Sequence, residues 1–229
     1  MAIFKDYFYH NSIKKYTMAI GTLFNDIQVV RLKSDGSEDH RVTVPLSYAP
    51  REKFIRRLEQ DYGNNTKVTA ITLPRMAYEL ISLNYDPQRK LQKARKFSHI
   101  RTDGVYPTKE YVYTPVPFDF MFSLNIVTKT QDEMMQIVEQ IVPGFTPDLN
   151  ITIKGLNGPD SIYDIPVALL DVMPSDSYEG GFDERRQILW SMTFMLKGYL
   201  FGPTGDNPII LLPDVKFFDW NTLTESDDG

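Results

Sequence analysis

Cysteine is absent from the 229 residues of this chain, and its absence excludes several kinds of chemistry together. Without thiols there is no disulfide, no thiolate nucleophile, and no zinc ribbon or iron–sulfur cluster held by cysteine. The N-terminus has no basic stretch followed by an apolar segment, and no apolar run approaches membrane-spanning length. We therefore expect a protein that folds in a reducing cytoplasm and is neither exported nor embedded in a membrane.

Catalytic and nucleotide-binding motifs are also missing. No G-x-S-x-G turn is present for a serine nucleophile, and the glycines within 155–158 and 180–181 lack the Walker lysine and the Rossmann spacing. The three histidines, His10, His40 and His99, stand alone among polar residues, with no second ligand or base at a useful spacing. The sequence therefore predicts no catalytic residue, no cofactor and no metal site.

Acidic residues outnumber basic ones, 30 to 25, but several of the basic residues are concentrated in one stretch. The formal net charge of -5 argues against a surface devoted to gripping nucleic acid. Between Asp86 and Asp103 the chain carries basic residues and no acid. We expect a loop or a short exposed helix there, which either is solvated or faces an acidic protein or a nucleic acid backbone. The basic residues are Arg89, Lys90, Lys93, Arg95, Lys96 and Arg101.

A second charged candidate contact is the run Asp183-Glu184-Arg185-Arg186. Alternating charge before a strand is usually a solvated or interface edge, so Arg185 and Arg186 join the basic stretch as candidate protein-contact residues. The enzymatic alternative is a hydrolase that uses Asp183 or Glu184 in a cleft beside Arg185. A pocket gathering those carboxylates would favour that alternative.

Aromatic residues are abundant, at 13% of the chain, and many fall in alternating runs. Residues 118–126 hold strict apolar alternation, which is typical of a strand with one buried face. Residues 167–172 are apolar enough to form a strand covered on both faces. Further strands are predicted at 81–85, 151–153 and 190–196, and a hairpin at 27–46 around a polar turn.

Three amphipathic helices are predicted between these strands. The first runs over 12–24, with Ile13, Tyr16, Ile20 and Phe24 on one face and Asn11 or Ser12 as the cap. The second begins near Pro50 and stops at Gly63. The third follows a capping box formed by Thr130 and Glu133 and ends at Pro143. Residues 1–220 thus read as a single α+β domain, with a largely antiparallel or mixed sheet flanked by about three helices, and 221–229 as an acidic flexible tail.

A series of short motifs runs in order through most of the chain. It begins at Tyr7-Phe8-Tyr9, continues through Leu23-Phe24 and Val44-Pro45, and includes Leu73-Pro74-Arg75. Its most specific block is 136–141 followed by Pro143, Phe145 and Pro147, and then Arg185-Arg186 with Trp190-Ser191. This series resembles the tail sheath stabiliser and completion protein family of T4-like contractile-tailed bacteriophages. The motif series does not extend into the segment 89–101 or into the residues after Pro203.

The resemblance implies a structural virion protein that has no enzymatic activity and acts as a tail terminator. Such a protein would cap and stabilise the finished tube and sheath as a hexameric ring and offer a surface for neck and head joining. Its partners would be further copies of itself, the tail sheath protein, the tail tube or tube terminator protein, and neck or head-completion proteins. DNA would be only cargo passing through the lumen. The expected location is the tail end of the virion, after assembly in the host bacterial cytoplasm.

A second assembly role remains open. In this alternative the chain is a neck protein that contacts portal-side partners or DNA through the basic segment 89–101.

Overall fold

The computed structural model describes residues 7–33, 37–52, 73–101, 108–156, 162–176 and 188–208. Its helices are α1 (Ser12–Leu23), α3 (Gln131–Ile141) and the short 3-10 helix η1 (Val142–Gly144). Its first strands are β1 (Gln28–Leu32), β2 (Glu38–Thr43), β3 (Leu46–Tyr48), β4 (Arg75–Tyr85), β5 (Lys96–Arg101) and β6 (Thr108–Tyr113). The remaining strands are β7 (Val116–Thr128), β8 (Asp148–Lys154), β9 (Ile162–Asp176), β10 (Ile188–Leu200) and β11 (Thr204–Pro208).

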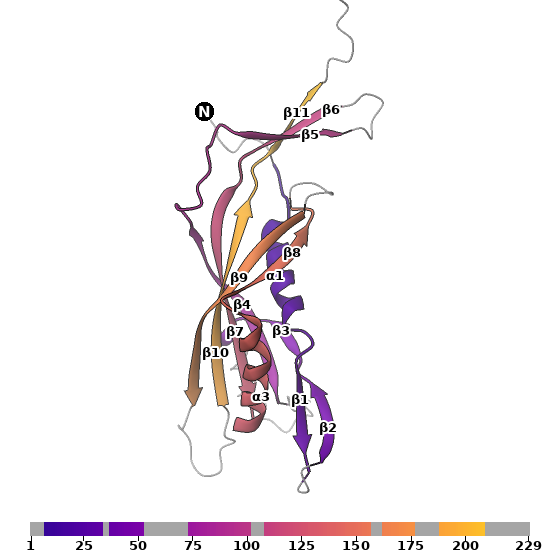
Figure 1. Ribbon diagram of the computed structural model, residues 1–229, viewed down its shortest axis with the longest axis vertical. Helices are drawn as coiled ribbons and strands as arrows, with labels where there is room; N and C mark the ends of the chain where they lie inside the picture. The colour runs from indigo at the N-terminus through magenta and orange to yellow at the C-terminus, as the bar shows by residue number, and fades with distance from the viewer. Residues whose placement is uncertain are drawn as a thin grey trace, which may run out of the picture.

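The molecule is elongated and built on a central sheet in the order β3-β4-β7-β10-β9-β8 (Figure 1). Only the pair β3–β4 is parallel, and every other pair in this sheet is antiparallel. A three-stranded sheet, β11-β6-β5, extends from one end, and the β1–β2 hairpin lies towards the other. The predicted α+β class with a mixed, largely antiparallel sheet is confirmed. The predicted second helix at 50–63 lies almost entirely outside the described residues.

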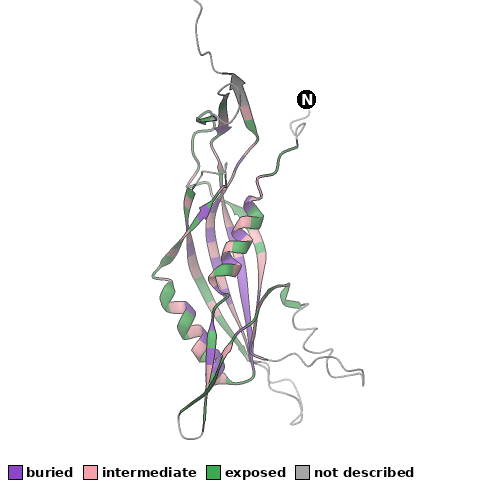
Figure 2. Ribbon diagram, turned by 90° about the vertical axis from the view of Figure 1, so that its right-hand side faces the viewer, coloured by how far each residue is buried: buried purple, intermediate pink, exposed green. Residues whose placement is uncertain are grey.

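The core lies between the central sheet and the two helices, and Figure 2 shows buried strand residues behind them. Phe122 on β7 pairs in register with Phe194 on β10, and both side chains are fully buried. The Phe194 ring also lies 4.9 Å from that of Phe24 and 5.1 Å from that of Phe145. The alternation predicted for 118–126 and 190–196 is therefore confirmed as the buried face of two adjacent central strands.

Helix α1 follows its predicted period with one exception. Tyr16, Ile20 and Phe24 are buried as expected, but Ile13 is exposed because Ser12 occupies the buried position one turn before Tyr16. The predicted side-chain cap is also wrong. Asn11 is the N-cap residue, yet its backbone is left-handed, with φ 57°, and its side chain makes no capping hydrogen bond.

Two strand predictions need correction. The segment 167–172 was expected to be covered on both faces, but Leu170 on β9 is half exposed, at 50%. Leu170 is the residue skipped where the pairing of β9 with β10 shifts, so a bulge turns its side chain outwards. The predicted hairpin is confirmed as β1–β2, but Leu46 leaves it and pairs with Met76 in the central sheet.

The hydroxyl of Tyr16 predicts a specific response to alkaline pH. It donates a hydrogen bond to the Tyr199 carbonyl at 2.7 Å and accepts one from the Tyr199 amide at 3.0 Å. Burial raises the pKa of Tyr16 from 10.0 to about 12. Between these two pH values the unfolded chain ionises this group and the folded chain does not, so stability falls as pH rises. We expect Tyr16 to contribute a loss of about 2–3 kcal/mol in the free energy of unfolding between pH 10 and 12.

Urea denaturation at pH 9, 10, 11 and 12 measures this loss. In Tyr16→Phe the decline above pH 10 should be shallower than in the unchanged protein, since the other tyrosines titrate in both proteins. Equal slopes would show that Tyr16 does not cause the decline.

Candidate interaction surfaces

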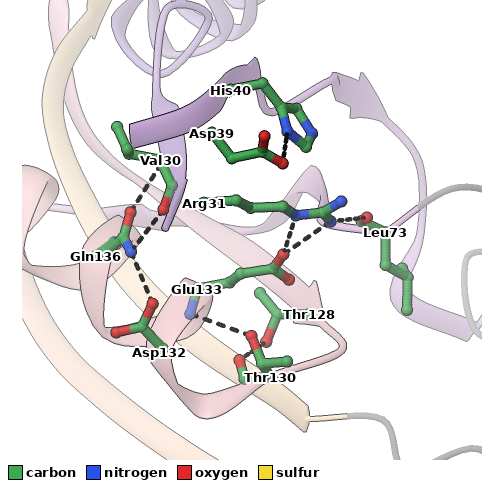
Figure 3. Close-up of polar contacts among 10 residues, drawn as sticks. All are labelled: Val30, Arg31, Asp39, His40, Leu73, Thr128, Thr130, Asp132, Glu133 and Gln136. Carbon is green, nitrogen blue, oxygen red and sulfur yellow. Dashed lines mark hydrogen bonds and ion pairs between the residues drawn. The ribbon is translucent and has the colours of Figure 1, made fainter. Parts of the chain in front are cut away.

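The β1–β2 hairpin is joined to α3 by the side-chain amides of two glutamines. The Gln136 amide nitrogen donates to the Val30 carbonyl at 3.0 Å, and its oxygen accepts from the Val30 amide at 2.9 Å (Figure 3). Gln140 makes the same pair of bonds with Gln28, at 2.7 Å to the carbonyl and 3.3 Å from the amide. Each side chain thus takes the place of a neighbouring strand, so we call these contacts the glutamine ladder.

The glutamine ladder depends on a match between two repeats. Gln136 and Gln140 are four residues apart and lie on one face of α3. Their spacing along the helix axis is about 6 Å. Gln28 and Val30 are two residues apart, which is about 6.6 Å along a strand. The two spacings agree closely enough for both amides to bond at once, which fixes the register of the hairpin against the helix.

An ion pair extends the same contact. The Arg31 guanidinium lies 2.8 Å from the Glu133 carboxylate and also donates to the Leu73 carbonyl at 3.4 Å (Figure 3). The Glu133 side chain is only 7% exposed, whereas that of Arg31 is 41% exposed. A nearly buried carboxylate is costly without a partner, so the pair ties β1 to the first turn of α3.

Of the two hydrogen bonds that define the predicted capping box, only one is present. The Thr130 hydroxyl accepts from the Glu133 amide at 3.4 Å, as expected for an N-cap residue. The Glu133 carboxylate, however, bonds to Arg31 and not to the Thr130 amide. A charge-assisted bond to a guanidinium is stronger than one to a neutral amide, which accounts for the difference.

The hairpin also leaves a groove and a free strand edge. A shallow groove of about 440 Å³ runs between the hairpin and α3, lined by Gln28, Val30, Arg41, Gln136, Glu139 and Gln140. On the far side of the hairpin, β2 pairs with β1 and with no other strand that the structure describes. An unpaired edge of this kind can accept a strand from a partner protein.

The second surface is the three-stranded sheet β11-β6-β5, which we call the platform. Its register puts Lys96 opposite Tyr113, Ser98 opposite Tyr111 and Ile100 opposite Lys109 on one face, the platform face. The Lys96 ammonium lies 4.3 Å from the centre of the Tyr111 ring and 5.0 Å from that of Tyr113. The platform face therefore combines positive charge with exposed aromatic surface.

The basic segment is partly a loop, as predicted, but its second half is strand β5 and no helix forms. The sequence does not indicate this strand, because its two apolar residues, Phe97 and Ile100, are three positions apart and so do not alternate. Side chains of Lys90, Lys93, Arg95 and Lys96 are exposed and have no carboxylate partner in the described part of the chain. These cations remain candidate contact residues.

Arg89 differs from the other predicted contact residues, because the fold itself occupies its guanidinium. The group lies 2.6 Å from the carboxylates of both Asp86 and Asp119, and 5.3 Å from the centre of the Tyr199 ring. Its hydrogen bond to Asp86 holds the pKa of that carboxyl below its usual value. Arg89 therefore holds the loop after β4 against β7 and β10.

The other predicted residues are placed less fully. The Arg101 backbone pairs with Thr108 in β5–β6. Arg185, Arg186, Asp183 and Glu184 lie outside the described residues.

Within the ranges that the structure describes, no group of three or more histidine, aspartate and glutamate side chains is arranged to hold a metal ion. Among the described helices, none has the length and apolar character required to cross a membrane.

Comparison with known proteins gives two consistent matches. Residues 7–228 match the family described as T4-like virus Myoviridae tail sheath stabiliser. The chain is also 31% identical over 223 residues to tail completion protein gp15 of Enterobacteria phage T4, covering 94% of this chain and 80% of that protein. The family match spans both segments that the motif series did not reach, 89–101 and the residues after Pro203.

Proposed function

The chain belongs to the T4-like virus Myoviridae tail sheath stabiliser family, and from this premise we propose that copies of it form a ring that ends the tail. As a member of this family it is a structural protein that completes the tail and stabilises its sheath. The ring would hold six copies, sit on the last layer of tube and sheath, and present its other side to neck or head-completion proteins. Its place would be the tail end of the virion, after assembly in the host cytoplasm.

An exposed apolar row at one edge of the central sheet supports ring closure. Ile81, Leu83 and Tyr85 on β4 are 57%, 41% and 46% exposed, and Tyr48 on β3 is 56% exposed. Beyond Tyr78, β4 pairs only with β7 in the described part of the chain. Apolar side chains in a row along a sheet edge are suited to packing against a second copy. A ring requires such a heterologous contact to repeat around its axis.

The elongated shape supports separate contacts at the two ends of the subunit. The hairpin and α3 lie towards one end, with the free β2 edge, and the platform extends from the other (Figure 1). We assign the hairpin end to the sheath and tube. The platform would then face the neck, and DNA would only pass through the lumen.

Tails assembled without this protein provide the test of the ring. The variant Ile81→Glu/Leu83→Glu places charge in the apolar row, so we expect electron micrographs to show at least about tenfold fewer capped tail ends than with the unchanged protein. Leu170→Glu/Met173→Glu is the matched control, since these side chains are 50% and 58% exposed and lie on β9, which does not adjoin β4 in the central sheet. Equal capping by Ile81→Glu/Leu83→Glu and the unchanged protein would exclude this edge from the ring contact.

The unpaired cations of the basic segment favour the neck contact as a second role. Reversing Lys90, Lys93 and Lys96 to glutamate should block the joining of heads to tails while tail length stays normal. Normal head joining by this variant would exclude the segment from the neck contact.

A further inference from the structure

The platform face is left uncovered by the described elements. Ile100 is 57% exposed and Tyr113 45% exposed, and Lys96 and Lys109 are exposed beside them. Neither lysine has a carboxylate partner within the described residues. A face that combines aromatic area with uncompensated positive charge is suited to an acidic, partly apolar occupant.

The chain leaves the described structure at the edge of this same face. Asn207 and Pro208, the last residues of β11, pair with Lys109 and Thr108 of β6. Adjacent strands are about 5 Å apart, so Asn207 lies about one strand spacing from Lys109, two residues before the segment 209–229 begins. From Lys109 to Tyr113, which lies opposite Lys96, the face extends along β6 for about 13 Å. Because β11 runs towards Thr108 and away from Tyr113, the segment must turn back to cover that distance. Residues 209–229 are long enough for such a turn and for the roughly five extended residues that the face needs.

The segment 209–229 has the composition that the platform face requires. It carries acids at Asp214, Asp219, Glu225, Asp227 and Asp228, against the single base Lys216. It also carries the aromatic residues Phe217, Phe218 and Trp220. The acids complement the lysines of the platform face, and the aromatic side chains suit the exposed surfaces of Ile100 and Tyr113.

We propose that residues 209–229 dock on the platform face of their own chain, with their acids beside Lys96 and Lys109. Direct attachment favours the same chain over a neighbour, because a short tether gives an effective concentration on the order of millimolar. The docked segment covers the basic face, so an acidic partner or DNA must compete with it there. This contact lies on a different surface from the ring contact, and either can hold without the other.

Carbodiimide cross-linking of the unmodified full-length protein tests the docking, because the reagent joins only carboxylates and amines that are in contact. We expect peptides that link Lys96 or Lys109 to acids within 209–229. The exposed residues Lys14, Lys129 and Lys154 serve as internal controls and should give no links to that segment. The expected links should fall about threefold or more in yield between 50 mM and 1 M salt, since charge attraction is screened.

An equal mixture of protein labelled with ¹⁴N and with ¹⁵N identifies the source of the segment. Docking within one chain predicts linked peptides that carry a single isotope. Links of mixed isotope would overturn the proposal by placing the segment on a neighbouring copy. The proposal also fails if Lys96 and Lys109 give no links, or give no more than the control lysines.

Discussion

Replacing Arg31 with methionine is expected to lower the free energy of unfolding by about 2–3 kcal/mol, because it leaves the Glu133 carboxylate nearly buried without its partner. That carboxylate is only 7% exposed, and its second oxygen already has no hydrogen-bond partner within the described residues. Urea denaturation at neutral pH measures the change. The double variant Arg31→Met/Glu133→Met should regain most of the loss, since an apolar pair leaves no buried charge.

The hairpin supplies a matched control. Arg41 pairs with Glu38 at 3.4 Å, and both side chains are more than half exposed. Arg41→Met should therefore cost less than about 0.5 kcal/mol. If Arg31→Met and Arg41→Met cost the same, burial of the Glu133 carboxylate does not determine the stability of this contact.

Replacing both Gln136 and Gln140 with methionine is expected to open the hairpin while the central sheet stays closed. Methionine has a similar length but offers no amide to the backbone of Gln28 and Val30. Four hydrogen bonds to β1 are lost, each with a net contribution of about 1 kcal/mol. Amide hydrogen exchange in β1 should therefore accelerate about a hundredfold, since some compensation by water is expected. Amides of β7 should exchange at their original rate.

The control for this variant lies on the same helix. Glu139 lines the groove but makes no hydrogen bond to β1, so Glu139→Met should leave exchange in β1 unchanged. Unaltered exchange in the double glutamine variant would show that the hairpin is held by contacts other than the glutamine ladder. Under the proposed function, an opened hairpin should also reduce the capping of tails.

Sequence periodicity predicted the core well because burial imposes the period directly. Phe122 and Phe194 lie in runs of alternating apolar residues and are buried. Tyr16, Ile20 and Phe24 recur at helical spacing and are buried as well. The prediction was wrong where a single residue changed the phase. On α1 it is Ser12, and not Ile13, that lies on the buried face. On β9 a bulge at Leu170 turns an apolar side chain towards solvent.

The candidate surfaces were harder to predict, because they depend on contacts between distant segments. Gln136 bonds to Val30 across 106 positions, and Gln140 to Gln28 across 112. Two glutamines four residues apart on a helix are ordinary surface residues unless the sequence also indicates that a strand edge lies beside them. The basic residues were visible by composition alone, but composition did not separate Arg89, which the fold occupies, from its exposed neighbours.

The glutamine ladder has a mechanical consequence for a protein of a tail sheath stabiliser family. Its two amide pairs lie one after the other along β1, and both come from α3. A load applied along the hairpin axis stretches both pairs in parallel, whereas a load applied across it breaks them one at a time. The attachment should therefore resist pulling along the strand far better than peeling. If the sheath binds the hairpin, the attachment of the hairpin to α3 withstands the greatest force when the sheath pulls along β1.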